Sequence, residues 1–233
     1  MARRDARIYS RSRPERSSPI KAHSTVERLR PLWHKSIPAT SRGLAVNFLL
    51  QWLVTQYAQP WRAYHNVYHV ERMFRIWQEV APTVPVIDPI GLALAIWFHD
   101  AVYDPKRRDN EEQSADEAES QLARIGVDTA QIASIRRMIL ATAAHKADDR
   151  NSDMALLLDL DLEILGAEPA EYDAYAHAIR QEYDFVSDQD YRMGRTQVLK
   201  HFLERPRIYL TDPMFARYEA PARRNMEREI SAI

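Results

Sequence analysis

Three groups of residues in this sequence have the types and spacing to hold a metal ion, and the first is a His-Asp pair. His99 and Asp100 close the most apolar stretch of the chain, which begins at Leu92. Burying a charged carboxylate there without a partner is costly, and a divalent cation would offset that cost. A buried His-Asp pair that only hydrogen-bonds is the alternative, and an isolated pair favours it. The metal interpretation therefore depends on the other two groups.

The second group is a pair of histidines four residues apart. In the segment YHNVYH, residues 64–69, a continuous helix would stack His65 and His69 on one face. Two stacked imidazoles can share one metal ion, or one can bind the metal while the other donates a proton. Without further partners, this spacing indicates a functional role no more strongly than a structural one.

The third group is a pair of aspartates in the leucine-rich run LLLDLDLE, residues 156–163. Two carboxylates in such a run are not typical of plain core. Asp159 and Asp161 would point in different directions from a helix, so we expect only one of them to enter a site. The alternative is a solvated helix face that carries Asp159 and Glu163, four residues apart.

The elements that must position these groups are predicted to be helices from about residue 24 onward. The stretch from Ile90 to Tyr103 is apolar nearly all round, which indicates a helix at the centre of a bundle. Predicted helix starts are marked by residues that cap helices: Ser41, Asn66, Asp88, Asp109, Asp128, Ser152 or Asp153, Asp188 and Thr211. We predict an all-α fold, with one domain over residues 25–233 that forms a bundle of about nine helices behind a disordered basic tail, residues 1–24.

Composition narrows the class of protein. The net charge of -1 favours neither a nucleic-acid nor a membrane partner, although residues 1–24 carry seven basic and two acidic side chains. The chain has no cysteine, so any metal site must use nitrogen and oxygen ligands, and a reducing cytoplasm is the expected location. No apolar run reaches the roughly 20 residues that a membrane span needs. We interpret the tail as disordered rather than as a targeting or nucleic-acid-binding segment.

Taken in order, the three groups resemble the HD superfamily of metal-dependent phosphohydrolases. The signature of that family is a histidine, a His-Asp pair and a later aspartate on a helical scaffold. The segments WFHDAVYD (97–104), DNEEQSA (109–115) and DLDLEILG (159–166) make the chain similar to a bacterial group described as predicted HD-superfamily metal-dependent phosphohydrolases. The resemblance runs from roughly residue 28 to residue 229.

The resemblance implies a set of metal ligands. They are His69, His99, Asp100 and one later aspartate, for which Asp161 fits the pattern slightly better and Asp159 is the alternate. Nitrogen and oxygen donors of this kind suit Mn, Fe, Co, Zn or Mg, as one ion or two.

The element Tyr-His-Asn-x-x-His also resembles the start of the cyclic-nucleotide phosphodiesterase site. In that family the first histidine donates a proton to the leaving oxygen, which implies that His65 is the general acid. The rest of that family's pattern is missing, so we do not predict cyclic-nucleotide specificity.

Four further residues have a role implied by the resemblance and an ordinary alternative. Glu111 would hold the attacking water or orient a ligand histidine, or it is a solvated carboxylate in the first turn of a helix. His145 would bind a second metal or the substrate phosphate, or it is a surface histidine at a helix end. Arg180 and Arg195 would bind phosphate, or form interhelical salt bridges, which we favour.

We therefore predict a metal-dependent phosphohydrolase that acts on a small phosphate ester or phosphoanhydride, with nucleotides among the candidates. Metal-activated water would attack phosphorus while protonated His65 donates to the leaving oxygen. Two alternatives stay open: a di-iron oxygenase of the HD type, which needs more histidine ligands, and a non-catalytic helical protein that binds nucleic acid through its arginine-rich tail. Under the first hypothesis we expect no membrane and no nucleic-acid partner. The pattern indicates no oligomeric state.

Overall fold

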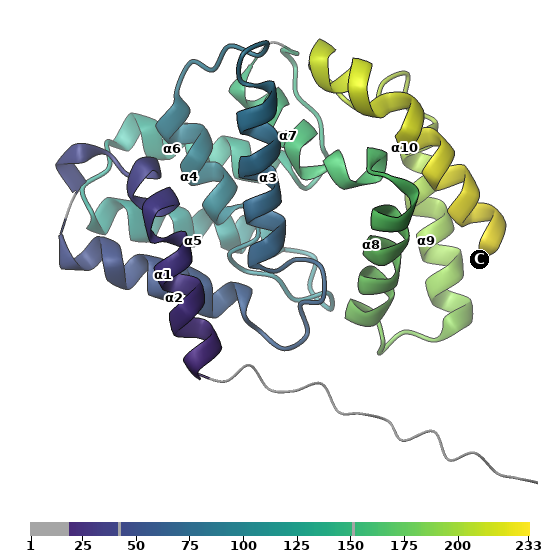
Figure 1. The fold of residues 1–233 in the computed structure, drawn as a ribbon, viewed down its shortest axis with the longest axis horizontal. Coiled ribbons are helices and arrows are strands. Elements are labelled where there is room, and N and C mark those ends of the chain that lie inside the picture. The colour runs from purple at the N-terminus through teal and green to yellow at the C-terminus, as the bar shows by residue number, and fades with distance from the viewer. Residues whose placement is uncertain (1–18, 42, 151) are drawn as a thin grey trace, which may run out of the picture.

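The chain is helical throughout the part that the structure describes. A computed structural model describes residues 19–233 except residues 42 and 151. Within these residues it contains ten α-helices, two 3-10 helices and no strand (Figure 1). The elements are α1 (Pro19–Ser36), η1 (Ala39–Ser41), α2 (Leu44–Tyr57), α3 (Val67–Val80), α4 (Pro89–Phe98), α5 (Asn110–Arg124), α6 (Thr129–Ala141), α7 (Asp153–Asp161), η2 (Glu163–Gly166), α8 (Pro169–Glu182), α9 (Asp188–Leu203) and α10 (Asp212–Ala232). The all-α prediction is confirmed, with ten α-helices where about nine were predicted.

The first helix begins before the predicted boundary of the folded domain. Residues 19–24 were assigned to the tail, but their backbone forms the first turns of α1. The predicted disorder of residues 1–18 lies outside the described residues. Further along α1, Val26, Leu29 and Trp33 are buried and anchor this helix in the core.

Most helix starts follow the capping residues that the sequence marks. The side chains of Asn66, Asp88, Asp128 and Ser152 each accept a hydrogen bond from a backbone N–H in the first turn of α3, α4, α6 and α7. Two predicted caps are shifted. Ser41 ends η1, and α2 begins after Gly43. The cap of α9 is Ser187, and Asp188 is the first residue of that helix.

Helix α4 lies at the centre of the group formed by α1 to α7 (Figure 1). It packs against α1, α3, α5, α6 and α7, and every residue from Gly91 to Phe98 is buried. The ring of Trp97 meets Trp33 edge-on at a centroid distance of 5.5 Å, and its indole nitrogen donates to Ser36 Oγ at 3.1 Å. Because such a helix ends inside the molecule, the two residues that follow it are carried into the interior.

Helices α8, α9 and α10 form a second group at the right of Figure 1, reached from α7 through η2. The contact of η2 with α10 is close, because a Cβ on Gly166 would lie 2.7 Å from Tyr218 Cβ. Asn225 of α10 donates to the carbonyls of Leu165 and Ala167 at 3.0 and 2.8 Å. These contacts fix the end of α7 relative to the C-terminal helices.

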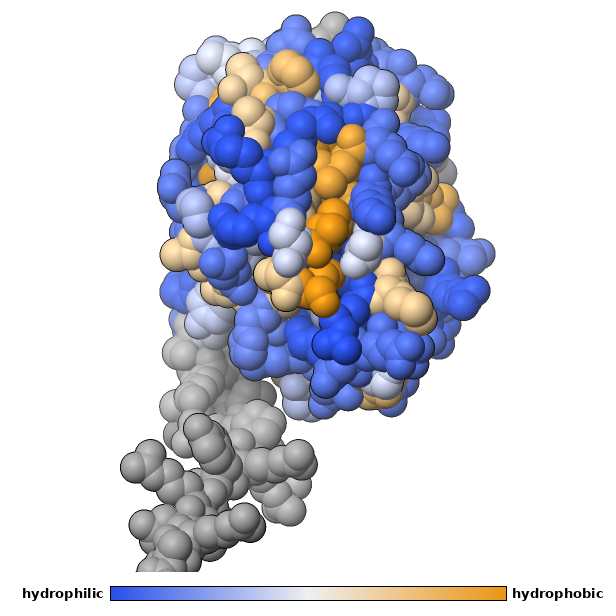
Figure 2. All heavy atoms as spheres, turned by 90° about the vertical axis from the view of Figure 1, so that its right-hand side faces the viewer, coloured by the Kyte–Doolittle hydropathy of each residue, from blue (hydrophilic) through white to orange (hydrophobic). Residues whose placement is uncertain are grey.

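The outer face of this second group is mostly hydrophilic, and a narrow apolar band crosses it (Figure 2). Among the described residues, the exposed apolar side chains of α9 include Met193 and Val198. None of the described helices combines the length and the apolar character that crossing a bilayer requires.

Candidate metal centre

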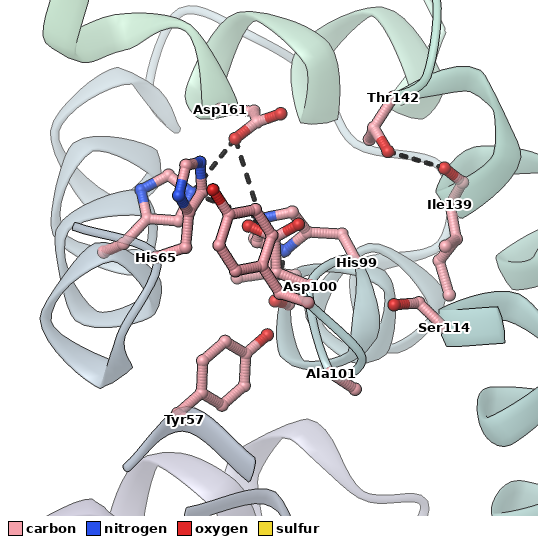
Figure 3. A network of polar contacts seen from close by, with 12 residues as sticks. Tyr57, His65, His99, Asp100, Ala101, Ser114, Ile139, Thr142 and Asp161 are labelled. Carbon is pink, nitrogen blue, oxygen red and sulfur yellow. Dashed lines mark hydrogen bonds and ion pairs between the residues drawn. The ribbon is translucent and has the colours of Figure 1, made fainter. Parts of the chain in front are cut away.

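Two histidines and one aspartate from three different helices converge at the end of α4. His69 lies in the first turn of α3, His99 directly follows α4, and Asp161 is the last residue of α7. The Nε2 atoms of His69 and His99 are 3.1 Å apart, and Asp161 Oδ1 lies 3.0 Å from the first and 3.6 Å from the second. One ligand atom from each of the three residues lies within 4.8 Å of the others. Figure 3 shows Asp161 and His99 pointing toward one another.

The local structure explains how each ligand reaches this point. The Asn66 cap starts α3 three residues before His69, whose backbone N–H donates to Asn66 O at 3.0 Å. His99 ends the buried helix α4, with its N–H on Ala95 O at 2.9 Å. Both imidazoles are buried, whereas the side chain of Asp161 keeps 15% of its exposure. The cluster therefore has buried walls and one side that small molecules can reach.

The donor set fits a cation. His99 Nδ1 lies 2.9 Å from Ile96 O, and an Nδ1–H that donates there leaves a lone pair on Nε2 in the neutral ring. This lone pair faces Nε2 of His69 and the carboxylates of Asp100 and Asp161. When Nε2 of His69 is also unprotonated, all of these groups are acceptors and none of them donates a proton to the others. Burial lowers the pKa of His99, but Asp100 and Asp161 outweigh it and raise the pKa to about 9. The pocket thus favours positive charge at this point.

Asp100 lies beside the cluster and contacts the imidazole of His99. Its Oδ2 is 3.2 Å from His99 Nε2. Burial raises the pKa of Asp100, but the charge and hydrogen bond of His99 hold it well below the usual value. Asp100 is therefore a carboxylate at neutral pH, next to the convergent trio of His69, His99 and Asp161.

His145 reaches the opposite oxygen of the same aspartate. Its Nε2 lies 2.8 Å from Asp161 Oδ2, so the carboxylate of Asp161 has an imidazole at each oxygen. The backbone of His145 has a φ of 47°, a conformation that is strained for residues other than glycine. Arg205 holds this turn by donating to the carbonyls of His145 and Ala144 at 3.0 and 3.1 Å. The strained turn directs the imidazole to the cluster.

His65 lies near the cluster and has a carboxylate of its own. Glu182, at the end of α8, accepts from the backbone N–H groups of Tyr64 and His65 at 2.7 and 2.9 Å. Its other oxygen lies 2.6 Å from His65 Nδ1 and accepts from the hydroxyl of Tyr103 at 2.8 Å. The Tyr103 ring also stacks on His65, with centroids 4.2 Å apart. Burial lowers the pKa of His65, but the hydrogen bond and charge of Glu182 outweigh this effect, so the pKa is raised overall.

Arg62 joins the His65 segment to the end of α4. Its guanidinium donates to the carbonyls of His65, Asp100 and Ala101 at 3.0, 2.6 and 3.1 Å. Its charge also lies over the ring of Tyr57, at 5.1 Å from the centroid. A single buried cation therefore fixes two of the three segments that form the site.

Glu182 and Arg62 were not predicted from the sequence. Glu182 lies 117 residues from His65, and no sequence pattern assigned it a role. Arg62 lies 38 residues from Asp100 and had no motif of its own. A buried carboxylate or guanidinium becomes recognisable as part of a site only when its distant partners are in place.

Asp159, the alternate ligand, is turned away from the cluster. Its Oδ1 accepts from the backbone N–H of Leu210 at 2.6 Å, and its Oδ2 accepts from the N–H and hydroxyl of Thr211 at 2.8 and 2.7 Å. Burial raises the pKa of Asp159 to about 6, against the effect of these donors. Of the two aspartates, only Asp161 contacts the histidines.

The remaining predicted site residues are not brought to the cluster by a contact. Glu111 is half-buried in the first turn of α5, and its carboxylate has no hydrogen bond or ion pair with another described residue. Arg180 donates to Tyr183 O at 2.7 Å and pairs with Asp188 at 2.6 Å. Arg195 is buried and pairs with Glu229 at 2.8 Å. Both arginines thus make the salt bridges that were the favoured alternative.

A cavity of about 580 Å³ borders His69. Tyr64, Tyr175 and Arg72 also line it. Arg72 is neutralised there by Glu163, at 2.6 Å. This cavity gives a small molecule access to the side of the cluster that carries His69.

No protein-family model, curated protein or solved structure matches this chain. The family that the sequence motifs resemble therefore stays a prediction.

Proposed function

We propose that this protein is a metal-dependent phosphohydrolase of the HD type, acting on a small phosphate ester or phosphoanhydride such as a nucleotide. One observation carries the proposal: the convergent His69, His99 and Asp161 lie close to a further histidine, His65, that is held by a separate carboxylate. The ring centroids of His65 and His69 are 6.1 Å apart. Hydrolysis of a phosphate needs both a cation and a proton donor, and this arrangement supplies a place for each.

His69, His99 and Asp161 would hold the ion, with Asp100 and His145 beside them. A divalent ion bound there would lower the pKa of water and polarise a phosphoryl oxygen. Imidazole and carboxylate ligands are compatible with Mn, Fe, Co, Zn or Mg. The hydrogen bond of His99 Nδ1 with Ile96 O would keep this ligand in the correct tautomer.

His65 would act as the general acid toward the leaving oxygen. Glu182 binds its Nδ1, which leaves Nε2 to donate a proton. Because Glu182 raises the pKa of His65, a larger fraction of the imidazole is protonated near neutral pH. The side chain is 22% exposed, so a bound substrate can reach it. Tyr103 and Arg62 hold the ring and its segment in place.

A di-iron oxygenase of the HD type is the second candidate, and His145 is the observation that favours it. His145 adds an imidazole at the second oxygen of Asp161, so His69, His99, Asp161 and His145 together would supply more ligands than a single ion requires. Oxygen chemistry on two irons needs this larger ligand set, whereas hydrolysis can use one ion or two.

The experiment that tests the proposal measures metal content and phosphate release on the same preparations. The full chain and an Asp161→Ala variant are loaded with Mn, Fe or Zn and assayed on aryl phosphates, nucleotides and pyrophosphate. We expect wild type to bind metal and release phosphate, and the variant to lose both.

His177→Ala, which replaces an exposed histidine of α8, is the matched control. Metal binding without phosphate release, but with oxygen uptake by the iron form, would favour the oxygenase. No metal binding would overturn both candidates and leave a non-catalytic binding protein.

A further inference from the structure

A second cavity, of about 620 Å³, lies next to the segment that carries His65. Ala63 and Glu182 are among the residues that line it, and Glu182 is the carboxylate that holds His65. The volume is within the range of about 300–1,000 Å³ that is typical of pockets for small organic ligands. None of the residues of the metal cluster lines this cavity.

Two aromatic side chains line this cavity and remain open to solvent. Trp61 is 45% exposed and Phe185 is 46% exposed. Trp61 is fixed because its indole nitrogen donates to Tyr103 O at 2.9 Å. Phe185 stacks against Tyr183 with centroids 5.9 Å apart and planes at 26°. Large flat side chains that are held rigidly and exposed in a hollow are suited to contact a flat ring.

The rest of the lining is polar and carries both hydrogen-bond donors and acceptors. Gln181 supplies an amide, and Asp104 and Asp184 supply carboxylates. The amine of Lys106 lies 5.0 Å from the centroid of Phe185 and has no ion pair with a described residue. A ring with donors and acceptors on its edge and an anionic group nearby would match this lining.

We propose that this cavity binds the base of a nucleoside phosphate, stacked on Phe185 and Trp61, with Lys106 near its charged part. The binding of the ring needs no metal, so this inference goes beyond the proposed hydrolysis. Glu182 connects the two, because this residue lines the cavity while its buried carboxylate holds His65. The base belongs either to the substrate or to a separate effector. In the substrate it would lie on the side of the leaving oxygen. Both ligands have the same ring chemistry.

The test is calorimetric titration of the full, metal-free chain, kept in chelator, with adenosine, AMP and ribose 5-phosphate. We expect adenosine and AMP to bind, and ribose 5-phosphate to bind much more weakly. Phe185→Ala should weaken AMP binding about tenfold or more, and Phe185→Tyr should restore it. Met193→Ala is the matched control, because Met193 is exposed on α9 and does not line the cavity.

Three results would overturn the proposal. The first is equal affinity of wild type and Phe185→Ala for AMP, and the second is equal affinity of wild type for AMP and ribose 5-phosphate. The third is no binding of adenosine and AMP to wild type at millimolar concentration. Circular dichroism of Phe185→Ala shows whether the variant is folded, and Lys106→Ala gives a second variant, which removes an exposed charge and its contact with the Phe185 ring. The metal-free titration does not depend on hydrolysis, so a failure of the proposed function leaves its outcome unchanged.

The source of the base is distinguished by phosphate release from the metal-loaded protein. If the base belongs to the substrate, Phe185→Ala raises KM for AMP and leaves KM for ribose 5-phosphate unchanged. If the base belongs to an effector, added adenosine changes the hydrolysis of ribose 5-phosphate in wild type, and this effect is lost in Phe185→Ala. Either result supports the base-binding cavity.

Discussion

Asp159 and Asp161 lie two residues apart on α7, and their carboxylates serve different parts of the molecule. Asp161 lies between His69 and His145, whereas Asp159 receives three hydrogen bonds from Leu210 and Thr211 at the start of α10. A helix turns about 100° per residue, so positions two apart point in nearly opposite directions. One short helix thus supplies a candidate ligand on one side and a structural cap on the other.

Substitution of these two aspartates should give opposite results. Asp161→Ala should abolish metal binding and leave the thermal stability of the metal-free chain nearly unchanged. Asp159→Ala should keep metal binding but lower the free energy of unfolding by about 2–4 kcal/mol, because buried donors lose their acceptor. Metal analysis by mass spectrometry and denaturant unfolding of both variants give the comparison. Loss of metal from Asp159→Ala with unchanged stability would reverse the two roles.

Removal of the charge of Glu182 should impair the proposed general acid without removing the metal. Glu182→Gln should lower kcat about tenfold to a hundredfold, the usual effect of a residue that orients a catalytic group. Glu182 raises the pKa of His65, so the variant should have a lower pKa there. A general acid must be protonated, and the activity of Glu182→Gln should therefore decline at lower pH than that of wild type.

The control for this variant is Glu168→Gln, which changes an exposed carboxylate just before α8. It should leave kcat, its pH profile and metal content unchanged. An unchanged pH profile in Glu182→Gln would show that the protonation of His65 does not limit the reaction.

The features that could be predicted from the sequence are those set by local contacts. Asn66, Asp88, Asp128 and Ser152 cap helices within their own first turns, so each start could be identified from a few residues. The apolar run from Leu92 similarly predicted the central helix. A shift of one or two residues at Ser41 and Asp188 arose where several small or polar residues compete as caps.

The features that could not be predicted depend on partners far apart in the chain. The role of Glu182 is defined by His65 and Tyr103, and that of Arg62 by the end of α4. Arg195 was assigned two roles, because an arginine that binds phosphate and one that pairs with a distant glutamate have the same local sequence. The preference for Asp161 over Asp159 came from the family pattern, and its contacts with two histidines agree with that preference.

Arg195 is expected to be a structural residue of the C-terminal helices. It forms a buried ion pair with Glu229 at 2.8 Å and also donates to the Tyr175 hydroxyl at 3.2 Å. Arg195→Ala leaves the largely buried Glu229 carboxylate with the Tyr172 hydroxyl but without a compensating charge, and should lower the free energy of unfolding by about 3–5 kcal/mol. Denaturant unfolding measures this loss, and metal content should not change. Arg192→Ala, on the exposed side of the same helix, is the control. A higher KM in Arg195→Ala with unchanged stability would instead support a role in substrate binding.

The guanidinium group of Arg62 should be required at this position, because the ammonium group of lysine cannot reproduce its planar geometry. The guanidinium donates to three carbonyl oxygens from two segments, while an ammonium group is a compact charge without that planar spread. Arg62→Lys should lower the free energy of unfolding by about 2–3 kcal/mol, since buried carbonyls lose donors. It should also lower kcat, because His65 and Asp100 are positioned by the same group. The measurements are thermal unfolding and phosphate release, with Arg137→Lys on the exposed side of α6 as the control. Full activity and stability in Arg62→Lys would show that the charge alone is sufficient at this position.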